Sequence, residues 1–80
     1  MKYSNAIIDA VTSGLPQNLK AAIDDGEDIN ETTKISKING AMLALELGHY
    51  KLAKTLIRQG ININHETVSG ETLLMKVVRI

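Results

Sequence analysis

The most informative stretch of this sequence is Gly48-His49-Tyr50-Lys51-Leu52-Ala53-Lys54-Thr55-Leu56-Ile57-Arg58-Gln59-Gly60-Ile61-Asn62-Ile63-Asn64. Its residues Leu52, Ala53, Leu56 and Ile57 recur with the three- and four-residue spacing of one helix face. Glycines flank this segment, as is typical of residues that end a helix. We therefore predict a helix that buries these four side chains, and we expect Ile57→Ala to cost about 2–5 kcal/mol.

The same pattern occurs earlier in the chain at a constant offset. Gly14 and Gly48, and likewise Gly26 and Gly60, are each 34 residues apart. The offset also places apolar residues on apolar residues: Ala10 on Ala44, Val11 on Leu45, Leu19 on Ala53, Ala22 on Leu56 and Ile23 on Ile57. A period of this length indicates stacked structural repeats.

Each repeat also contains a shorter first helix. Its apolar positions are Ile7, Ala10 and Val11 in the first unit and Ala41, Ala44 and Leu45 in the second, and a glycine follows each set. Asn5, Asn39 and Thr72 precede the three first helices as N-cap residues, and Pro16 suits the start of a second helix. Each unit is therefore predicted to be a helical hairpin.

The segments between the hairpins lack a helical pattern. Residues 27–37 and 61–70 alternate polar residues with isolated aliphatic ones, which favours extended, finger-like loops. The first of these fingers is one residue longer than the second, because Gly26 precedes Asn39 by 13 positions and Gly60 precedes Thr72 by 12.

This arrangement resembles the ankyrin repeat, a unit of about 33 residues made of a turn-containing finger and two antiparallel helices. The resemblance covers nearly the whole chain and is strongest over residues 48–64. It departs from the family where Thr-Pro-Leu-His is usual, because those slots hold Asn5-Ala6-Ile7-Ile8, Asn39-Gly40-Ala41-Met42 and Thr72-Leu73-Leu74-Met75.

We accordingly expect an all-α fold, an ankyrin-like stack of helical hairpins with short extended fingers. One domain spans residues 1–80, with repeats at about 4–37 and 38–70 and a partial third repeat at about 71–80.

The composition argues against several classes of function. Nine Lys and Arg residues balance nine Asp and Glu residues, and this zero net charge disfavours binding to nucleic acid. The chain has no cysteine, and neither a signal peptide nor an apolar run of membrane-span length is apparent. We expect a cytoplasmic protein that does not bind membranes, or one secreted into a host cell if it belongs to an effector.

No motif for chemistry is evident. The sequence lacks a glycine-rich phosphate loop, a paired-histidine metal motif and a serine nucleophile elbow. His49 and His65 are 16 residues apart, and neither has a neighbouring histidine or cysteine. We therefore expect no catalytic residues, no cofactor and no metal ion.

The resemblance implies that the protein binds a partner protein, of unknown identity, through the concave face formed by the first helices and the finger tips. Leu43 and Leu47 are one helical turn apart on the face that the repeat core does not require. We expect Leu43→Glu to cost little stability. The full set of candidate partner-binding residues is Asp9, Ile35, Leu43, Glu46, Leu47, Val68, Lys76 and Arg79.

Two alternatives stay open. The chain could be a structural part of a larger protein, such as a bacterial effector or a viral protein, that docks on its own catalytic domain or self-associates through residues 72–80. It could also bind DNA through Lys51, Lys54 and Arg58, in which case its affinity should depend steeply on salt.

Overall fold

The computed structural model describes residues 6–78, and side chains as far as Met75. These residues form five helices: α1 (Ala6–Ser13), α2 (Pro16–Asp24), α3 (Gly40–Leu47), α4 (Tyr50–Arg58) and α5 (Leu73–Val78). Over the described range there is no strand, only an isolated antiparallel bridge between Thr32 and Asn39. The predicted fold class, two helical hairpins and part of a third unit, is confirmed.

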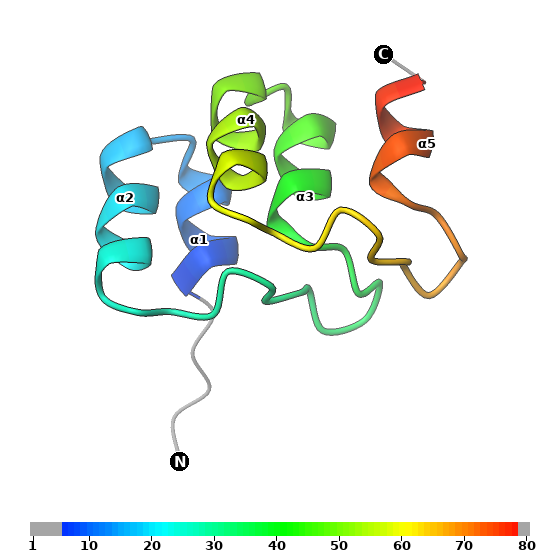
Figure 1. Ribbon diagram of the computed structural model, residues 1–80, viewed down its shortest axis with the longest axis horizontal. Coiled ribbons are helices and arrows are strands. Elements are labelled where there is room, and N and C mark those ends of the chain that lie inside the picture. The colour runs from blue at the N-terminus through cyan, green and yellow to red at the C-terminus, as the bar shows by residue number, and fades with distance from the viewer. Residues whose placement is uncertain (1–5, 79–80) are drawn as a thin grey trace.

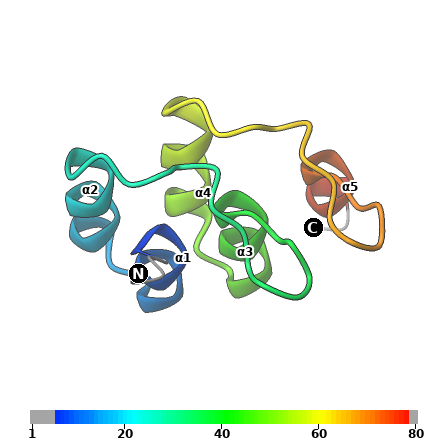
Figure 2. The same ribbon diagram turned by 90° about the horizontal axis from the view of Figure 1, so that it is seen from below.

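The helices lie in two rows. α1, α3 and α5 form an inner row, and α2 and α4 form an outer row that packs on it (Figures 1 and 2). α1 contacts α2 and α3, while α3 contacts α4 and α5, so that α3 is central to the stack. The two fingers run along one end of the helices and connect each outer helix to the next inner one (Figure 1).

The helix boundaries follow the capping residues predicted above. The Oδ1 atom of Asn39 accepts a hydrogen bond of 3.0 Å from the Met42 amide at the start of α3, as expected for an N-cap. Pro16 is the first residue of α2, where its missing N–H has no cost. Thr72 makes only a long contact of 3.5 Å with the Met75 amide. The predicted cap at Asn5 lies outside the described residues.

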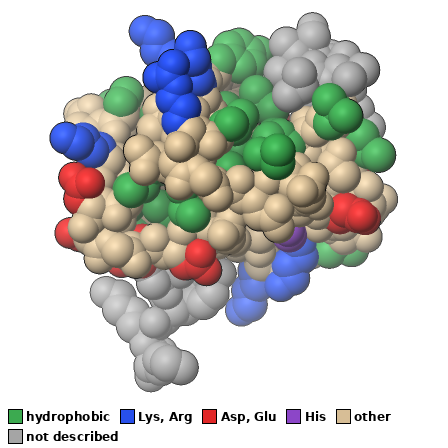
Figure 3. Space-filling model, viewed as in Figure 1, with side chains coloured by type: hydrophobic (Ala, Val, Ile, Leu, Met, Phe, Trp, Pro, Cys, Tyr) green, Lys and Arg blue, Asp and Glu red, His purple; other side chains and the backbone are tan. Residues whose placement is uncertain are grey.

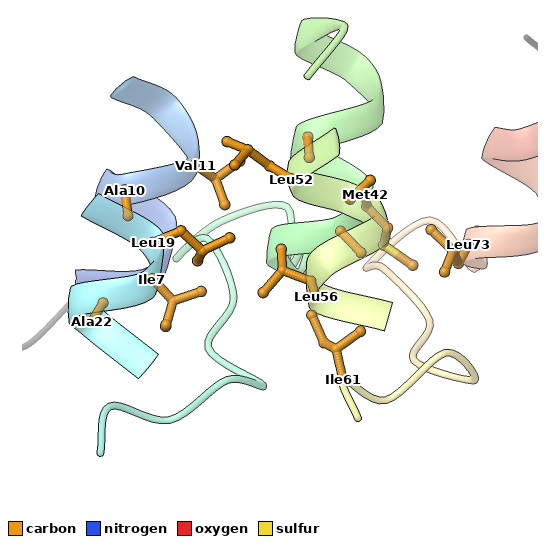
Figure 4. Packing of buried hydrophobic residues seen from close by; sticks show 13 residues of the cluster. Ile7, Ala10, Val11, Leu19, Ala22, Met42, Leu52, Leu56, Ile61 and Leu73 are labelled. Atoms are coloured by element: carbon orange, nitrogen blue, oxygen red, sulfur yellow. The ribbon is translucent and has the colours of Figure 1, made fainter. Parts of the chain in front are cut away.

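An aliphatic core joins the two rows. It consists of Ile7, Ala10, Val11, Leu19, Ala22, Ala41, Met42, Ala44, Leu52, Ala53, Leu56, Ile61 and Leu73 (Figure 4). Ile7, Val11 and Leu56 have no exposed surface, and Leu73 of α5 lies beside Met42 of α3 (Figure 4). The core therefore continues from the first hairpin through the second to the start of α5.

The prediction that Ile57 belongs to the core is wrong. Ile57 is 43% exposed, although its neighbour Leu56 is fully buried. Ile23, its counterpart in the first unit, is half-buried and packs on the core. The physical reason is the position of α4 at the end of the outer row, because among the described residues no further outer helix follows it.

Gly40 at the start of α3 has a packing role that the sequence did not reveal. A methyl group on its Cα would lie 3.1 Å from Leu56 Cδ1 and 3.3 Å from Ile7 Cγ2. Both distances are shorter than ordinary van der Waals contacts between carbon atoms. The glycine therefore lets α3 approach the first hairpin and α4 closely.

The fingers are held together by hydrogen bonds between side chains and backbone. The Asn62 amide donates to Asn30 Oδ1 at 2.7 Å, and Asn39 Nδ2 donates to the Asn62 carbonyl at 3.2 Å. His65 Nε2 lies 2.5 Å from the Lys37 carbonyl. These bonds connect the second finger to the first and so fix the fingers relative to α3.

Glu31 of the first finger caps the amino end of α1. Its Oε1 atom accepts hydrogen bonds from the amides of Ile7 at 3.1 Å and Ile8 at 3.4 Å. Burial raises the pKa of the Glu31 carboxyl, and the negative charges of Glu27 and Asp28 raise it further, while the two amide bonds lower it. The finger thus satisfies helix N–H groups that are usually capped by a residue preceding the helix.

Candidate functional site

The candidate site is the inner face of the stack, formed by α1 and α3 together with the two finger tips. Asp9 of α1 and Glu46 of α3 are exposed, and Leu47 of α3 is 45% exposed. These three residues were predicted to point away from the core, and the structure places all three on the surface. We call Asp9, Leu43, Glu46 and Leu47 the inner strip.

Leu43 differs from this expectation because it is half-buried and packs against the core cluster. Helices α1, α4 and α5 all contact α3, so that part of the α3 surface is covered. The prediction that the repeat core does not require Leu43 is therefore wrong, and Leu43→Glu would place a charge against the core. Leu47, one turn further along, is the more accessible of the two leucines.

The remaining inner-face candidates lie in or after α5. Lys76 is within α5, but its side chain is outside the described part of the structure. Arg79 lies beyond the described residues. Their proximity to the inner strip stays a prediction.

The two finger tips present aliphatic side chains to solvent. Ile35 is 86% exposed and Val68 is 71% exposed. The Val68 amide donates a hydrogen bond of 3.1 Å to the Ser36 carbonyl, and this bond joins the tips. The structure thus brings together two candidates that are 33 positions apart in the sequence.

The finger tips enclose a shallow groove that sequence reasoning missed. Its volume is about 320 Å³, and it is lined by Ile35, Ser36, Ile38, Thr67, Val68, Ser69 and Glu71. Both fingers contribute to its wall, so its existence depends on how the second finger lies against the first. Leu47, at the far end of α3, is not part of this groove.

Two lysines at the first finger tip are further residues of the site that were not predicted from the sequence. Lys34 and Lys37 are both exposed and flank Ile35 in the chain. They lie on the same finger that contributes Ile35 to the groove, whereas Asp9 and Glu46 of the inner strip are acidic. The tip of the first finger therefore carries positive charge, whereas the acidic Glu71 lines the groove and Asp9 and Glu46 place negative charge on the helices of the inner strip.

Within residues 6–78, no group of three or more His, Cys, Asp and Glu side chains is placed to hold a metal ion. Over the same part of the chain, no helix has the length and apolarity needed to cross a membrane. Lys51, Lys54 and Arg58 are exposed on α4, on the outer side of the stack.

Comparison with known proteins gives one clear result. Neither a protein-family description nor a curated protein matches this chain. Among solved structures 106 chains match, including the ankyrin repeat domain of human ASB11, with a TM-score of 0.78 and 30% sequence identity. That match covers 91% of this chain, which spans only 33% of the longer human chain. A match that combines such coverage with this sequence identity shows that the chain has the ankyrin repeat fold.

Proposed function

We propose that this chain is a non-catalytic protein-recognition module whose inner face binds a partner protein. The observation that carries the proposal is the exposure of Leu47, Ile35 and Val68, which are aliphatic side chains with little share in the core. Ankyrin and other repeat stacks use extended concave surfaces for binding. Exposed aliphatic side chains on such a surface are suited to become buried in an interface.

The charges of the inner face support an orienting role for its polar residues. Asp9 and Glu46 lie on the helices, while Lys34 and Lys37 flank Ile35 on the finger. Complementary charges on a partner raise the association rate and fix the direction in which it binds. Lys76 and Arg79 extend this set in our proposal.

The test is a crosslinking capture experiment that compares the native chain with two single variants. Leu47→Glu places a charge on the inner face, and Leu15→Glu is the matched control because Leu15 is also 45% exposed but precedes α2. Circular dichroism establishes first that all three chains are folded.

We expect a protein captured by the native chain to be retained by Leu15→Glu and lost with Leu47→Glu. Equal capture by both variants would show that the inner face does not bind the partner. A partner protein identified in this way can then be tested against Ile35→Glu and Val68→Glu, which probe the finger tips separately.

A further inference from the structure

The tips of the two fingers are closed loops of the same construction. The Thr33 amide donates a hydrogen bond of 2.9 Å to the Ile38 carbonyl, and Thr33 Oγ1 accepts one of 3.0 Å from the Ile38 amide. In the second finger, the Thr67 amide donates to the Glu71 carbonyl at 2.9 Å, and Thr67 Oγ1 accepts from the Glu71 amide at 3.1 Å. Each threonine therefore closes the loop at the tip of its finger.

These closed loops hold the two projecting aliphatic side chains, Ile35 and Val68, in place. The loop of the first finger is residues 34–37 and that of the second is residues 68–70, so the additional residue of the first finger lies in its tip. The bond from the Val68 amide to the Ser36 carbonyl joins the two loops side by side. Side chains on loops that are fixed in this way lose little conformational freedom when an interface buries them.

The exposure of the tips does not result from the position of a finger in the stack. Ile35 is 86% exposed although the second finger follows the first, and Val68, at the corresponding position 33 residues later, is 71% exposed. The groove between the tips has one wall from each finger, and both walls belong to the described residues. A further finger added by the same repeat would lie beside the second finger and would leave this groove open.

The two tips carry opposite charges. Lys34 and Lys37 belong to the first tip, whereas Glu66 and Glu71 flank the second tip in the chain. Glu66 is exposed, and Glu71 is half-buried in the wall of the groove. Figure 3 shows basic side chains gathered at the lower edge of the molecule, below the fingers, and acidic side chains to their right. A basic tip and an acidic tip therefore lie next to each other, and each projects an aliphatic side chain.

A surface of this kind is complementary to itself. In a dimer with twofold symmetry, every contact between two residues occurs twice, with the roles of the two copies exchanged. When the symmetry axis passes between the tips, the basic tip of each copy faces the acidic tip of the other, and Ile35 and Val68 face the apolar walls of the opposite groove. A peptide of one sign of charge would instead be attracted by one tip and repelled by the other.

We propose that the finger tips bind a second copy of this chain in a dimer with twofold symmetry. This inference rests on the part of the proposed function that assigns binding to the finger tips, and it does not involve Leu47 of the inner strip. Because the two tips form a small patch, we expect a weak and reversible dimer with a dissociation constant on the order of 100 μM.

The test is sedimentation equilibrium of the full chain and its variants at low salt, where charge interactions are least screened. Ile35→Ser removes an aliphatic contact without adding a charge. Lys34→Glu and Glu66→Lys each bring like charges together across the proposed interface. Lys54→Glu, on the outer side of α4, is the control for a change in net charge. All four positions are exposed, so we expect unchanged circular dichroism.

Each of the three tip variants should weaken the dimer by about fivefold or more, whereas the control should stay within about twofold of the native chain. An equimolar mixture of Lys34→Glu and Glu66→Lys tests the pairing of the tips directly. This mixture should form a heterodimer with about the native affinity, because each reversed charge then faces an opposite charge in both contacts.

Three outcomes would overturn the proposal. These are a chain that is still monomeric at about 1 mM, a dimer that none of the tip variants weakens, and a mixture that associates no better than its components. A monomeric chain whose captured protein is lost with Ile35→Glu would assign the tips to a different partner protein and leave the proposed function intact. A dimer restored in the mixture, in a chain that captures no other protein, would contradict only the function proposed for the inner strip.

Discussion

The first and second helical hairpins share a sequence pattern but have different neighbours. Gly14 and Gly48 both follow an inner helix with positive φ, of 72° and 79°. A methyl group on Gly14 would lie 2.9 Å from the His49 ring, whereas nothing lies within 4 Å of the same position on Gly48. Equivalent residues therefore meet different surroundings, because the second hairpin covers the first, while among the described helices only α5 follows the second.

The largest expected effect is a difference in the free energy of unfolding between substitutions at two adjacent residues of α4. Leu56→Ala should reduce the free energy of unfolding by about 2–5 kcal/mol, because Leu56 is fully buried between the hairpins. Ile57→Ala should cost about 1 kcal/mol or less, since much of that side chain is already in contact with water. Urea denaturation followed by circular dichroism measures both. Equal costs would contradict the difference in burial between these two positions.

The N-caps of α3 and α5 provide a second comparison. Asn39→Ala should cost about 1–3 kcal/mol, because it removes the cap of the Met42 amide and the bond to the Asn62 carbonyl from a buried site. Thr72→Ala should cost less than about 0.5 kcal/mol, given its 3.5 Å contact. The same denaturation experiment applies. A larger loss for Thr72→Ala would show that α5 depends on its cap more than α3 does.

The two glycines that follow the inner helices test the effect of the neighbouring hairpin directly. Gly48→Ala should cost about 1 kcal/mol, because alanine tolerates a left-handed conformation less well than glycine. Gly14→Ala should cost about 1 kcal/mol more than that, since its methyl group also displaces the His49 ring. His49→Ala in the Gly14→Ala background should recover this additional part. Without such recovery, the ring is not the source of the extra cost.

The smallest expected effect concerns the finger that caps α1. Because the pKa of Glu31 is raised in the folded chain, the folded state binds more protons than the unfolded state above the ordinary pKa of about 4.3. The contribution of Glu31 to stability should therefore decrease as the pH rises through the range above this ordinary pKa. Glu31→Gln keeps an oxygen acceptor for Ile7 and Ile8 but removes the titration.

The measurement is the difference in free energy of unfolding between the native chain and Glu31→Gln as a function of pH. We expect this difference to become less favourable to the native chain as the pH rises through that range. An increasing difference would mean that the two amide bonds outweigh the burial of the carboxylate, and a constant difference would mean that the two effects cancel.

Local features of the fold were predictable from the sequence because they depend on residues close together in the chain. Pro16, Asn39, Gly14 and Gly48 mark helix boundaries through their own backbone and capping preferences. The spacing of the apolar residues gave the helices, and the constant offset between units gave the stack. Helices and chain reversals can therefore be predicted without information on contacts between residues that are far apart in the chain.

The candidate site was predictable only in part. Asp9, Glu46, Leu47, Ile35 and Val68 are exposed as expected, since helical spacing and loop position are enough to assign them to the surface. The groove between the fingers was not predictable, because it depends on the bond between the Val68 amide and the Ser36 carbonyl. Lys34 and Lys37 could be assigned to the candidate site only after the structure had shown that Ile35, which they flank, lines the groove.

The positions of the helices, the turns of the hairpins and the length of the repeating unit follow from local preference and periodicity, and the amino-acid sequence was enough to predict them. Which apolar residues are covered depends on contacts between helices that are far apart in the chain. Ile57 was expected to be buried and is 43% exposed, whereas Leu43 was expected to lie outside the core and packs against it. The reason is that the burial of a residue depends on the neighbouring helix and not only on the helix that carries it. In a stack of repeats, each unit supplies only part of its own core, and the adjacent unit supplies the rest.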